Sequence, residues 1–279
     1  MKRESLSMDF LTEIMGLKRE RLARVKNASA EGELRARAHE VRERAQPHAL
    51  RMTVNEGGRV NIIAEIKRAS PSKGEIRASV EPAKIAREYE AGGAAAISVL
   101  TEEDRFRGSL DDLRAVRVAV GLPLLRKDFI FDEFQVYEAA AAGADALLLI
   151  VAALDDGQLT RLIRQTEDEL RMDALVEVHT RAELMRAHAC GATLVGVNNR
   201  DLRTFEVSLE TSVKLAGDAP PGVTLVSESG LRSGDDLRRL RSLGYKGFLI
   251  GETLMRAPEP DKALRRLIEE TEEGRKDKG

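Results

Sequence analysis

Two lysines, three glutamates and one asparagine stand at or near the C-terminal ends of short apolar runs in this chain. Alternate side chains of an extended strand share a face, so Glu65 and Lys67 lie on the face of Ile63. The same alternation gives the other four a common facing within their own runs: Lys127, Glu177, Asn198 and Glu228. Gathered in one place, lysines that supply a proton or bind an anion and carboxylates that accept a proton would form an acid–base site. Their proximity would shift their pKa values in directions useful for proton transfer.

The runs that carry these residues predict buried parallel strands, which alternate with helices along the chain. We expect strands at 60–67, 95–100, 124–127, 146–150, 174–178, 193–198, 223–227 and 247–250, and helices at 82–91, 109–119, 133–142, 155–170, 180–189, 208–216, 233–243 and 259–272. This alternation predicts an α/β protein of the (β/α)8 TIM barrel class, whose strand ends converge on one open face. A doubly wound open sheet is the alternative, but no GxGxxG motif follows a strand.

Plain surface charges at loop entrances are the alternative to a site. For any single residue that reading is the better one, but for six residues at matching strand ends it is much weaker.

Ser229–Gly230 follows the seventh predicted strand and Gly251–Glu252 follows the eighth. Barrels often bind phosphate in these two loops through backbone N–H groups, although two ordinary tight turns would look the same.

The first 55 residues predict a charged, helical N-terminal extension. One apolar stripe of an amphipathic helix, interrupted by Lys18, runs through Leu11, Ile14, Met15, Leu22 and Val25. The aliphatic stem of Lys18 can lie along that stripe. A second helical stretch covers about 31–45. We therefore treat residues 1–279 as a single domain, with the extension at 1–55 and the barrel at 60–272; the extension is either solvated or covers a site.

Composition narrows the possible partners and location. The net charge of −2 gives no sign of a nucleic-acid partner, and the absence of Trp argues against base stacking. The longest apolar run, 146–154, is far shorter than the roughly 20 residues that span a bilayer, and the N-terminus lacks the apolar core of a secretory signal. Cys190 is the only cysteine, which excludes an internal disulfide and favours the reducing cytoplasm.

Other residues of the chain could in principle act as metal ligands, bases or nucleophiles. No HxH, HExxH or paired-cysteine pattern supports a metal site. His179 is interpreted as a loop residue rather than a base, and Cys190 as a small buried hydrophobe. Ser70 lacks the context of a nucleophile, but its hydroxyl can donate a hydrogen bond to an anion.

At these residues the sequence resembles the indole-3-glycerol phosphate synthase family. The resemblance rests on IIAEIKRASPSKG, SVLTEEDRFRGS, LLRKDFIFDEFQ, LVEVH, VGVNNRDLRTF, SESG and LIGETLMR. The N-terminal LTEIMGLKRERLARVK also resembles the extra helix that packs over the barrel mouth in this family. The resemblance implies a carboxy-lyase of tryptophan biosynthesis that uses no metal or organic cofactor. Its substrate would be 1-(2-carboxyphenylamino)-1-deoxyribulose 5-phosphate, which closes its ring with loss of carbon dioxide and water.

The resemblance also implies a role for each strand-end residue. Lys127 would be the general acid that protonates the ketone oxygen, with Glu177 as its carboxylate partner. Lys67 would bind anionic groups and act in dehydration, and Glu65 would orient Lys67 or take part in later proton transfers. The polar middle of the substrate would be held by Asn198 and Glu228.

The two ends and the ring of the substrate would occupy different parts of the mouth. Arg200 would bind the anthranilate carboxylate, because its fork matches two oxygens, with help from Ser70. The phosphate would be bound by Ser229, Gly230, Gly251 and the backbone N–H of Glu252, whose acidic side chain must then point away. The apolar slot for the ring would be lined by Leu100, Phe106, Phe129, Leu148 and Ile150, for which plain barrel core is the alternative.

Two rival functions remain open from the sequence. A different phosphate-binding barrel enzyme, such as a sugar-phosphate isomerase or epimerase, would share the phosphate loops but need neither the set of Lys67, Lys127 and Glu177 nor an aromatic slot. A non-catalytic barrel that binds a phosphometabolite or a partner is the other. The sequence leaves the oligomeric state open, although many members of the family are monomers.

Overall fold

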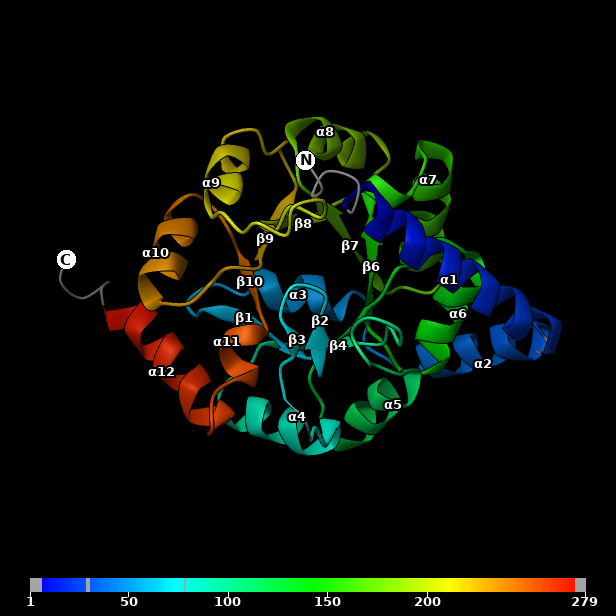
Figure 1. Ribbon diagram of the computed structural model, residues 1–279, viewed down its shortest axis with the longest axis horizontal. Helices are drawn as coiled ribbons and strands as arrows, with labels where there is room; N and C mark the ends of the chain where they lie inside the picture. Colours follow the sequence, from blue (N-terminus) through cyan, green and yellow to red (C-terminus); the bar gives the residue numbers. More distant parts are fainter. Residues whose placement is uncertain (1–6, 29–30, 78, 274–279) are drawn as a thin grey trace.

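Eight parallel strands close into a barrel in the order β1-β10-β9-β8-β7-β6-β5-β4 (Figure 1). The computed structural model describes residues 7–28, 31–77 and 79–273. The strands are β1 (Asn61–Ile66), β4 (Ala96–Leu100), β5 (Leu124–Lys127), β6 (Ala146–Ile150), β7 (Asp173–Val178), β8 (Leu194–Asn198), β9 (Thr224–Glu228) and β10 (Gly247–Ile250). The predicted TIM barrel is confirmed, and every strand end falls within one residue of its expected place.

Eight helices follow the eight strands and surround the barrel. They are α4 (Pro82–Ala91), α5 (Leu110–Ala119), α6 (Glu133–Ala141), α7 (Asp156–Arg164), α8 (Arg181–Ala189), α9 (Glu210–Ala216), α10 (Gly234–Ser242) and α12 (Pro260–Glu273). Several begin at an N-cap whose side chain accepts a backbone N–H, as Ser109, Asp132 and Thr180 do. The helix expected at 155–170 is in fact α7 followed by a π-helical turn, Gln165–Glu169.

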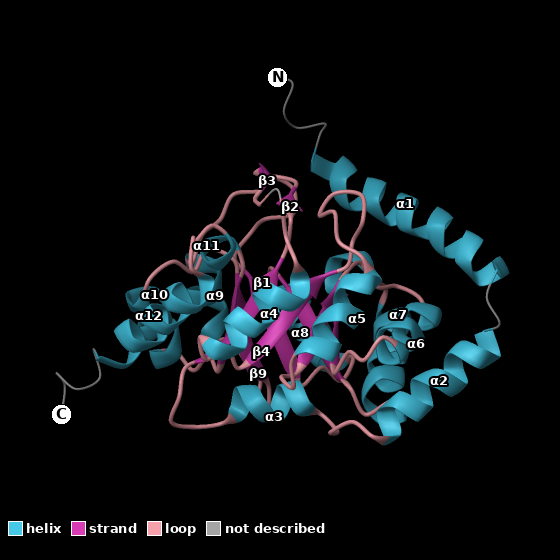
Figure 2. Cartoon of the chain, turned by 90° about the horizontal axis from the view of Figure 1, so that it is seen from below, coloured by secondary structure: helices cyan, strands magenta, loops and turns pink. Residues whose placement is uncertain are grey.

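Four short elements were not predicted as separate elements. A hairpin of β2 (Ala69–Ser70) and β3 (Gly74–Glu75) rises from the loop after β1, and α11 (Glu252–Met255) follows β10. The helix α3 (Ala49–Asn55) lies at the end of the barrel opposite that hairpin (Figure 2). Its Leu50 and Val54 pack into the barrel interior and close its lower end.

Side-chain alternation sorts the strand residues into two cores. The inner core holds Ile63, Leu125, Leu175, Leu194 and Val226, all on the inward faces that the sequence pattern indicated. The outer core lies between the barrel and its helices. Since both faces of each strand are buried, the inward facing of Glu65, Lys127, Glu177 and Glu228 follows directly from the apolar residues two positions earlier.

The extension consists of α1 (Ser7–Ala28) and α2 (Glu31–Glu43). Ile14 and Met15 of α1 are buried in the inner core cluster, whereas Val25 is exposed although the sequence placed it on the same stripe. Lys18, whose aliphatic stem the sequence allowed to lie along the stripe, is buried as a whole residue. Within the described residues, none of the helices is long and apolar enough to cross a membrane.

A buried arginine fastens α2 to the closed end of the barrel. The Arg42 guanidinium donates to Asp145 (3.0 Å) and to the carbonyl oxygens of Ala144, Leu170 and Arg171. From the sequence, a charged extension of this kind could be solvated. Arg42 is instead buried, and a buried guanidinium requires a hydrogen-bond partner for each of its donors.

A second polar cluster lies beside it at the same end. Asp173 accepts the backbone N–H of Arg51 (2.9 Å), and Glu167 accepts that of Ala174 (3.3 Å). Burial raises the pKa of Glu167 to about 7 against the opposing charge of Arg51. Glu167 therefore keeps its proton to higher pH in the folded than in the unfolded state, and the free energy of unfolding falls as pH rises from the ordinary glutamate range to about 7.

Replacing Glu167 by Gln should remove this pH-dependent loss. We expect the variant to unfold with a free energy higher than that of the wild type at pH 8 by at most ~3 kcal/mol, and with a much smaller difference near pH 5. Urea unfolding at the two pH values measures it, with Glu40→Gln on the exposed face of α2 as the control. An equal difference at both pH values would contradict the assignment.

Candidate active site

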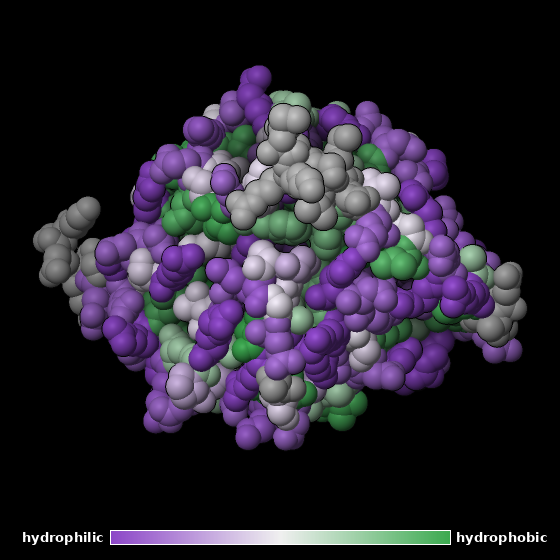
Figure 3. Space-filling model, in the orientation of Figure 1, coloured by the Kyte–Doolittle hydropathy of each residue, from purple (hydrophilic) through white to green (hydrophobic). Residues whose placement is uncertain are grey.

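A cavity of about 710 Å³ opens at the C-terminal ends of the strands. Hydrophilic residues dominate the outer rim of this face, and apolar residues show nearer its centre (Figure 3). Every residue that the sequence placed in the site lines the cavity. They are Glu65, Lys67, Ser70, Leu100, Phe106, Lys127, Phe129, Leu148, Ile150, Glu177, Asn198, Arg200, Glu228, Ser229, Gly230, Gly251 and Glu252.

The charged centre of the cavity is one layer of the barrel. Glu65, Lys127, Glu177 and Glu228 come from the alternate strands β1, β5, β7 and β9. The strand registers place each of them two strands and two residues from the next, because Glu177 pairs with Gly196, which pairs with Val226 two positions before Glu228. Barrels of this class stack their interior side chains in such layers of four. Two positions earlier on the same four strands, the inward side chains are apolar: Ile63, Leu125, Leu175 and Val226.

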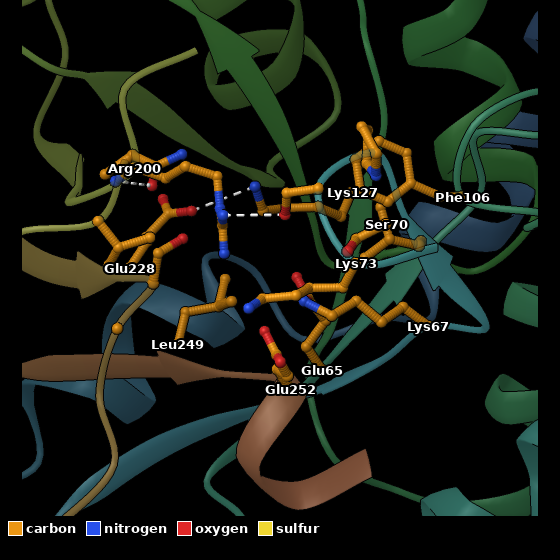
Figure 4. Close-up of a pocket in the computed structure, with 18 of the residues that line it drawn as sticks. Glu65, Lys67, Ser70, Lys73, Phe106, Lys127, Arg200, Glu228, Leu249 and Glu252 are labelled. Carbon is orange, nitrogen blue, oxygen red and sulfur yellow. Dashed lines mark hydrogen bonds and ion pairs between the residues drawn. The ribbon is translucent and has the colours of Figure 1, made fainter. Parts of the chain in front are cut away.

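Lys127 lies between two carboxylates in this layer. Its Nζ atom is 3.1 Å from Glu177 Oε2 and 3.1 Å from Glu228 Oε2 (Figure 4). Both glutamates are almost completely buried, and Lys127 is nearly so. An ammonium group in such a place requires opposite charges around it, because burial alone disfavours the charged form.

The pKa values of these three buried groups are shifted in different directions, and each shift has an identifiable cause. Burial lowers the pKa of Lys127, but the carboxylates of Glu228, Glu177 and Glu65 outweigh it and hold the value above the usual range. Burial raises the pKa of Glu228 to about 7 in spite of Lys127, and the neighbouring Glu177 adds to the rise. For Glu177 the effect of burial is outweighed by Lys127, His179 and the amide of Asn198, so its pKa lies below its ordinary value. Near neutral pH, Lys127 and Glu177 are charged while Glu228 titrates.

A second pair stands beside the first. Lys67 Nζ is 2.5 Å from Glu65 Oε1 at the end of β1, and both point into the cavity (Figure 4). A Cβ atom on Gly251 would collide with the Glu65 carboxylate and lie 2.8 Å from Lys67 Nζ. A Cβ atom on Gly196 would likewise collide with Glu228 Oε1. Glycine at these two positions therefore makes the space that the carboxylates occupy.

The loops after β9 and β10 form one end of the cavity. Ser229 (φ 66°) and Gly230 (φ 81°) both adopt the left-handed conformation, which turns the chain sharply after Glu228. Gly251 precedes the short helix α11, whose first residue is Glu252. The Glu252 carboxylate pairs with Arg256 Nε at 3.1 Å, and this pair lies at the edge of the cavity. Backbone N–H groups and nearby cations give this end the character of an anion site.

Arg200 stands in the loop after β8. Its guanidinium donates to Ser72 Oγ (3.0 Å) and to the carbonyl of Phe205 (3.2 Å), while its backbone N–H donates to Asn198 Oδ1 (3.0 Å). The hydroxyl of Ser70 in the same hairpin is buried and has no hydrogen-bond partner among the residues that the structure describes. A guanidinium and a hydroxyl that can both donate to a ligand are suited to a carboxylate.

An aromatic wall lines the apolar side, and part of it was missed in the sequence. Phe129 contacts Phe106, with ring centroids 6.5 Å apart, and Phe10 of α1 edge-on at 6.3 Å. Phe10 also meets Phe205 at 5.3 Å. The position of Phe10, four residues before the buried Ile14 on one helix face, was the available signal. Other cavity residues that were not predicted include Lys73, Leu202, Phe205, Arg232 and Arg256.

His179 follows β7 in a loop, as interpreted, but it also touches the charged layer. Its Nε2 atom is 3.5 Å from Glu177 Oε1 and its Nδ1 atom is 3.4 Å from Glu183 Oε2. Burial lowers the pKa of His179, yet the bond to Glu183 and the charge of Glu177 outweigh burial and raise it. A positive His179 helps to keep Glu177 ionised.

One group of carboxylates is close enough together to share a cation among the described residues: Glu102, Glu103 and Asp104. The Glu102 carboxylate already accepts the backbone N–H groups of Asp104, Arg105 and Phe106. Glu103 and Asp104 pair with cations of α1. These carboxylates are therefore engaged in holding the loop after β4.

Fold and cavity together define a TIM barrel with a charged central layer, an apolar wall and two ends whose groups are suited to anions. The family model described as "Indole-3-glycerol phosphate synthase" matches residues 11–267. The indole-3-glycerol phosphate synthase of Carboxydothermus hydrogenoformans is 49% identical over 263 residues, covering 93% of this chain and 99% of the relative. That of Desulfosudis oleivorans is 46% identical over 262 residues, covering 93% and 98%. The chain belongs to the indole-3-glycerol phosphate synthase family.

Solved structures with low sequence identity share the fold. Thiamine phosphate pyrophosphorylase from Pyrococcus furiosus superposes with a TM-score of 0.58 at 19% identity, covering 80% of this chain and 98% of the other. KGPDC from Streptococcus mutans gives 0.59 at 16% identity, covering 77% and 99%. At these identities the likeness concerns the barrel alone.

A methyl group at Gly196 should disable the charged layer. Since the Cβ atom of Gly196→Ala would displace the Glu228 carboxylate from Lys127, we expect the rate of indole-3-glycerol phosphate formation to fall by roughly 10²-fold. Gly217→Ala is the matched control, because its Cβ meets no atom within 4 Å and its φ is −73°. Equal rates in the two variants, both folded by circular dichroism, would contradict this reading of Gly196.

Proposed function

We propose that this chain closes the ring of 1-(2-carboxyphenylamino)-1-deoxyribulose 5-phosphate to give indole-3-glycerol phosphate. The chain is a carbon–carbon lyase of tryptophan biosynthesis, with the decarboxylase activity of its family. The observation that carries the proposal at the level of residues is the buried Lys127 held by Glu177 and Glu228 in one barrel layer. An isomerase or epimerase, or a non-catalytic barrel, would not need that arrangement next to an aromatic wall.

Ring closure requires a proton donor at the ketone. As the aromatic carbon attacks the carbonyl carbon, the C=O electrons move to oxygen, and Lys127 gives that oxygen its proton. Glu177, ionised at neutral pH, stabilises the positive charge that builds on the anilino nitrogen. Loss of carbon dioxide returns the electron pair of the broken C–C bond to the ring, which restores the benzene ring and neutralises the nitrogen. The new hydroxyl group then leaves as water, and loss of a proton from the neighbouring CH2 carbon completes the indole.

Dehydration needs a second acid and base near the first. Lys67 and Glu65 form the adjacent pair, 2.5 Å apart, and reach the same space. In our proposal Lys67 helps the hydroxyl to leave as water, and Glu65 orients Lys67 or takes part in the proton transfers. Asn198 and Glu228 hold the polar middle of the substrate.

The ends of the substrate match the ends of the cavity. The phosphate is held by backbone N–H groups of Ser229, Gly230, Gly251 and Glu252, with the Glu252 side chain turned to Arg256. The anthranilate carboxylate meets Arg200 and the unpaired hydroxyl of Ser70. The aromatic ring occupies the slot between the two ends, lined by Leu100, Phe106, Phe129, Leu148 and Ile150.

The wider setting completes the proposal. The partner is a small phosphorylated metabolite, without nucleic acid or membrane, and the enzyme needs neither metal nor organic cofactor. We further propose a monomer in the cytoplasm. Residues 1–279 then form a single domain made of the N-terminal helical extension, 1–55, and the 60–272 barrel; within the extension α1 covers the mouth, whereas α3 closes the opposite end.

The direct test mixes the purified chain with the anthranilate-derived ribulose phosphate. Indole fluorescence should appear in the absence of added metal and persist in the presence of EDTA. A folded protein that forms no indole product would overturn the proposed function.

Lys127→Ala separates catalysis from binding. We expect the variant to bind substrate with an affinity close to that of the wild type, because both anion-binding ends remain. Turnover should fall by roughly 10²- to 10⁴-fold, the usual contribution of a general acid. Lys262→Ala, at an exposed ion pair with Glu259, is the control and should keep full turnover. A rate near that of the wild type would show that the proton comes from another group.

A further inference from the structure

Asp128, the residue after Lys127, lies at the centre of a buried polar cluster that is separate from the charged layer of the barrel. Its side chain is fully buried and lies 2.7 Å from Lys18 Nζ. It also accepts from Thr101 Oγ1 (2.7 Å), from Arg126 Nη2 (3.1 Å) and from the backbone N–H of Phe129 (2.8 Å). Burial raises the pKa of Asp128, but Lys18 and Arg126 outweigh it and lower the pKa to about 2.

This cluster fixes the direction of two cavity residues. Lys127 and Phe129 flank Asp128 in the chain, and all three residues line the cavity. The Asp128 carboxylate, however, is engaged with Arg126, the outward neighbour two positions earlier. Because Asp128 also accepts the N–H of Phe129, the backbone between general acid and aromatic wall is held on both sides.

The cation that completes the cluster comes from the other end of the chain. Lys18 lies in the middle of α1, its side chain is 6% exposed, and it also contacts Glu103 at 3.2 Å. Arg21, one turn later, pairs with Glu103 (2.6 Å) and Asp104 (3.0 Å). The helix α1 is thereby joined to the β4–α5 loop that carries Phe106 and to the residue next to Lys127.

We infer that Lys18 is a positioning residue for Lys127, acting through Asp128. Its ammonium is the counter-charge that keeps Asp128 in place, and Asp128 in turn sets the backbone from which Lys127 and Phe129 enter the cavity. Without Lys18, Asp128 retains Arg126 and Thr101 but loses the one cation on its α1 side, and it shifts toward its remaining partners. The inference rests on the proposed function, because it concerns the proton donor of that reaction.

The same helix supplies a matched comparison. Lys26 pairs with Asp132 at 2.6 Å, again linking α1 to the segment after β5. Both partners of this pair are about one-third exposed, and Asp132 caps α6 rather than adjoining a cavity residue. A change that merely loosens α1 should affect the two lysine variants alike, whereas a change that misplaces Lys127 should appear in Lys18 alone.

The experiment compares Lys18→Met and Lys26→Met by steady-state kinetics on the anthranilate-derived ribulose phosphate. We expect Lys18→Met to lower kcat by roughly 10- to 100-fold, as for an acid misplaced by about 1 Å, and to change KM less than kcat. Lys26→Met should stay within about threefold of the wild type in both constants, because an ion pair that is about one-third exposed contributes little. Lys18→Arg, which keeps the charge, should recover most of the lost kcat.

A double-mutant cycle tests the route through Asp128. Since both residues act on Lys127 through one contact, Lys18→Met combined with Asp128→Asn should lower kcat no further than the worse single variant. The inference would be overturned if the kcat losses of the two single variants multiplied in the double variant. It would also be overturned if Lys18→Met kept a kcat close to that of the wild type, or if the Lys18 and Lys26 variants lost equal amounts of kcat. If Lys18→Met does not fold, Asp128→Asn against Asp132→Asn makes the same comparison. A wild-type protein without turnover would instead refute the proposed function.

Discussion

The burial of one ammonium group among carboxylates is the constraint on which the site depends. Lys127 stays charged inside a barrel only because Glu177 and Glu228 lie 3.1 Å away on either side. The registers of the strands bring these groups together, since residues two strands and two positions apart fall in one layer. The eight-stranded geometry of the barrel thus supplies the electrostatics of the site, and the glycines at 196 and 251 supply the room.

The same constraint explains the charge balance of the cavity. The central layer holds three carboxylates and one ammonium, and burial, together with this excess of negative charge, raises the pKa of Glu228 to about 7. In the proposed binding mode both anionic ends of the substrate would lie away from this centre, at backbone N–H groups on one side and at Arg200 on the other. The neutral ketone and the anilino nitrogen would then meet the layer, where a developing cation is favoured and a proton donor is present.

Much of this arrangement was accessible from the sequence, because strand periodicity is a local property. The alternation that predicted a common face for Glu177 and Leu175 needed no knowledge of distant segments. The barrel followed from the repetition of strand and helix along the chain. Lys18, Arg42 and Phe10 were not accessible in the same way. A lysine or arginine in a charged helix is ordinarily solvated, and only the partners contributed by other elements, such as Asp128 and Asp145, show that these two are buried. The short helices α3 and α11 lacked the length over which a period can be recognised.

The extension is joined to the chemistry of the barrel by contacts of two kinds. Phe10 adds an apolar edge to the wall beside Phe129, and Lys18 adds a charge to the carboxylate that adjoins Lys127. Packing alone would hold a helix at the mouth in several registers, since an apolar stripe tolerates small slides along its axis. A buried ion pair tolerates far less, because an unpaired charge in that place is costly. The register of α1, and with it the position of Phe10, is therefore determined by the same bond that steadies the segment carrying Lys127.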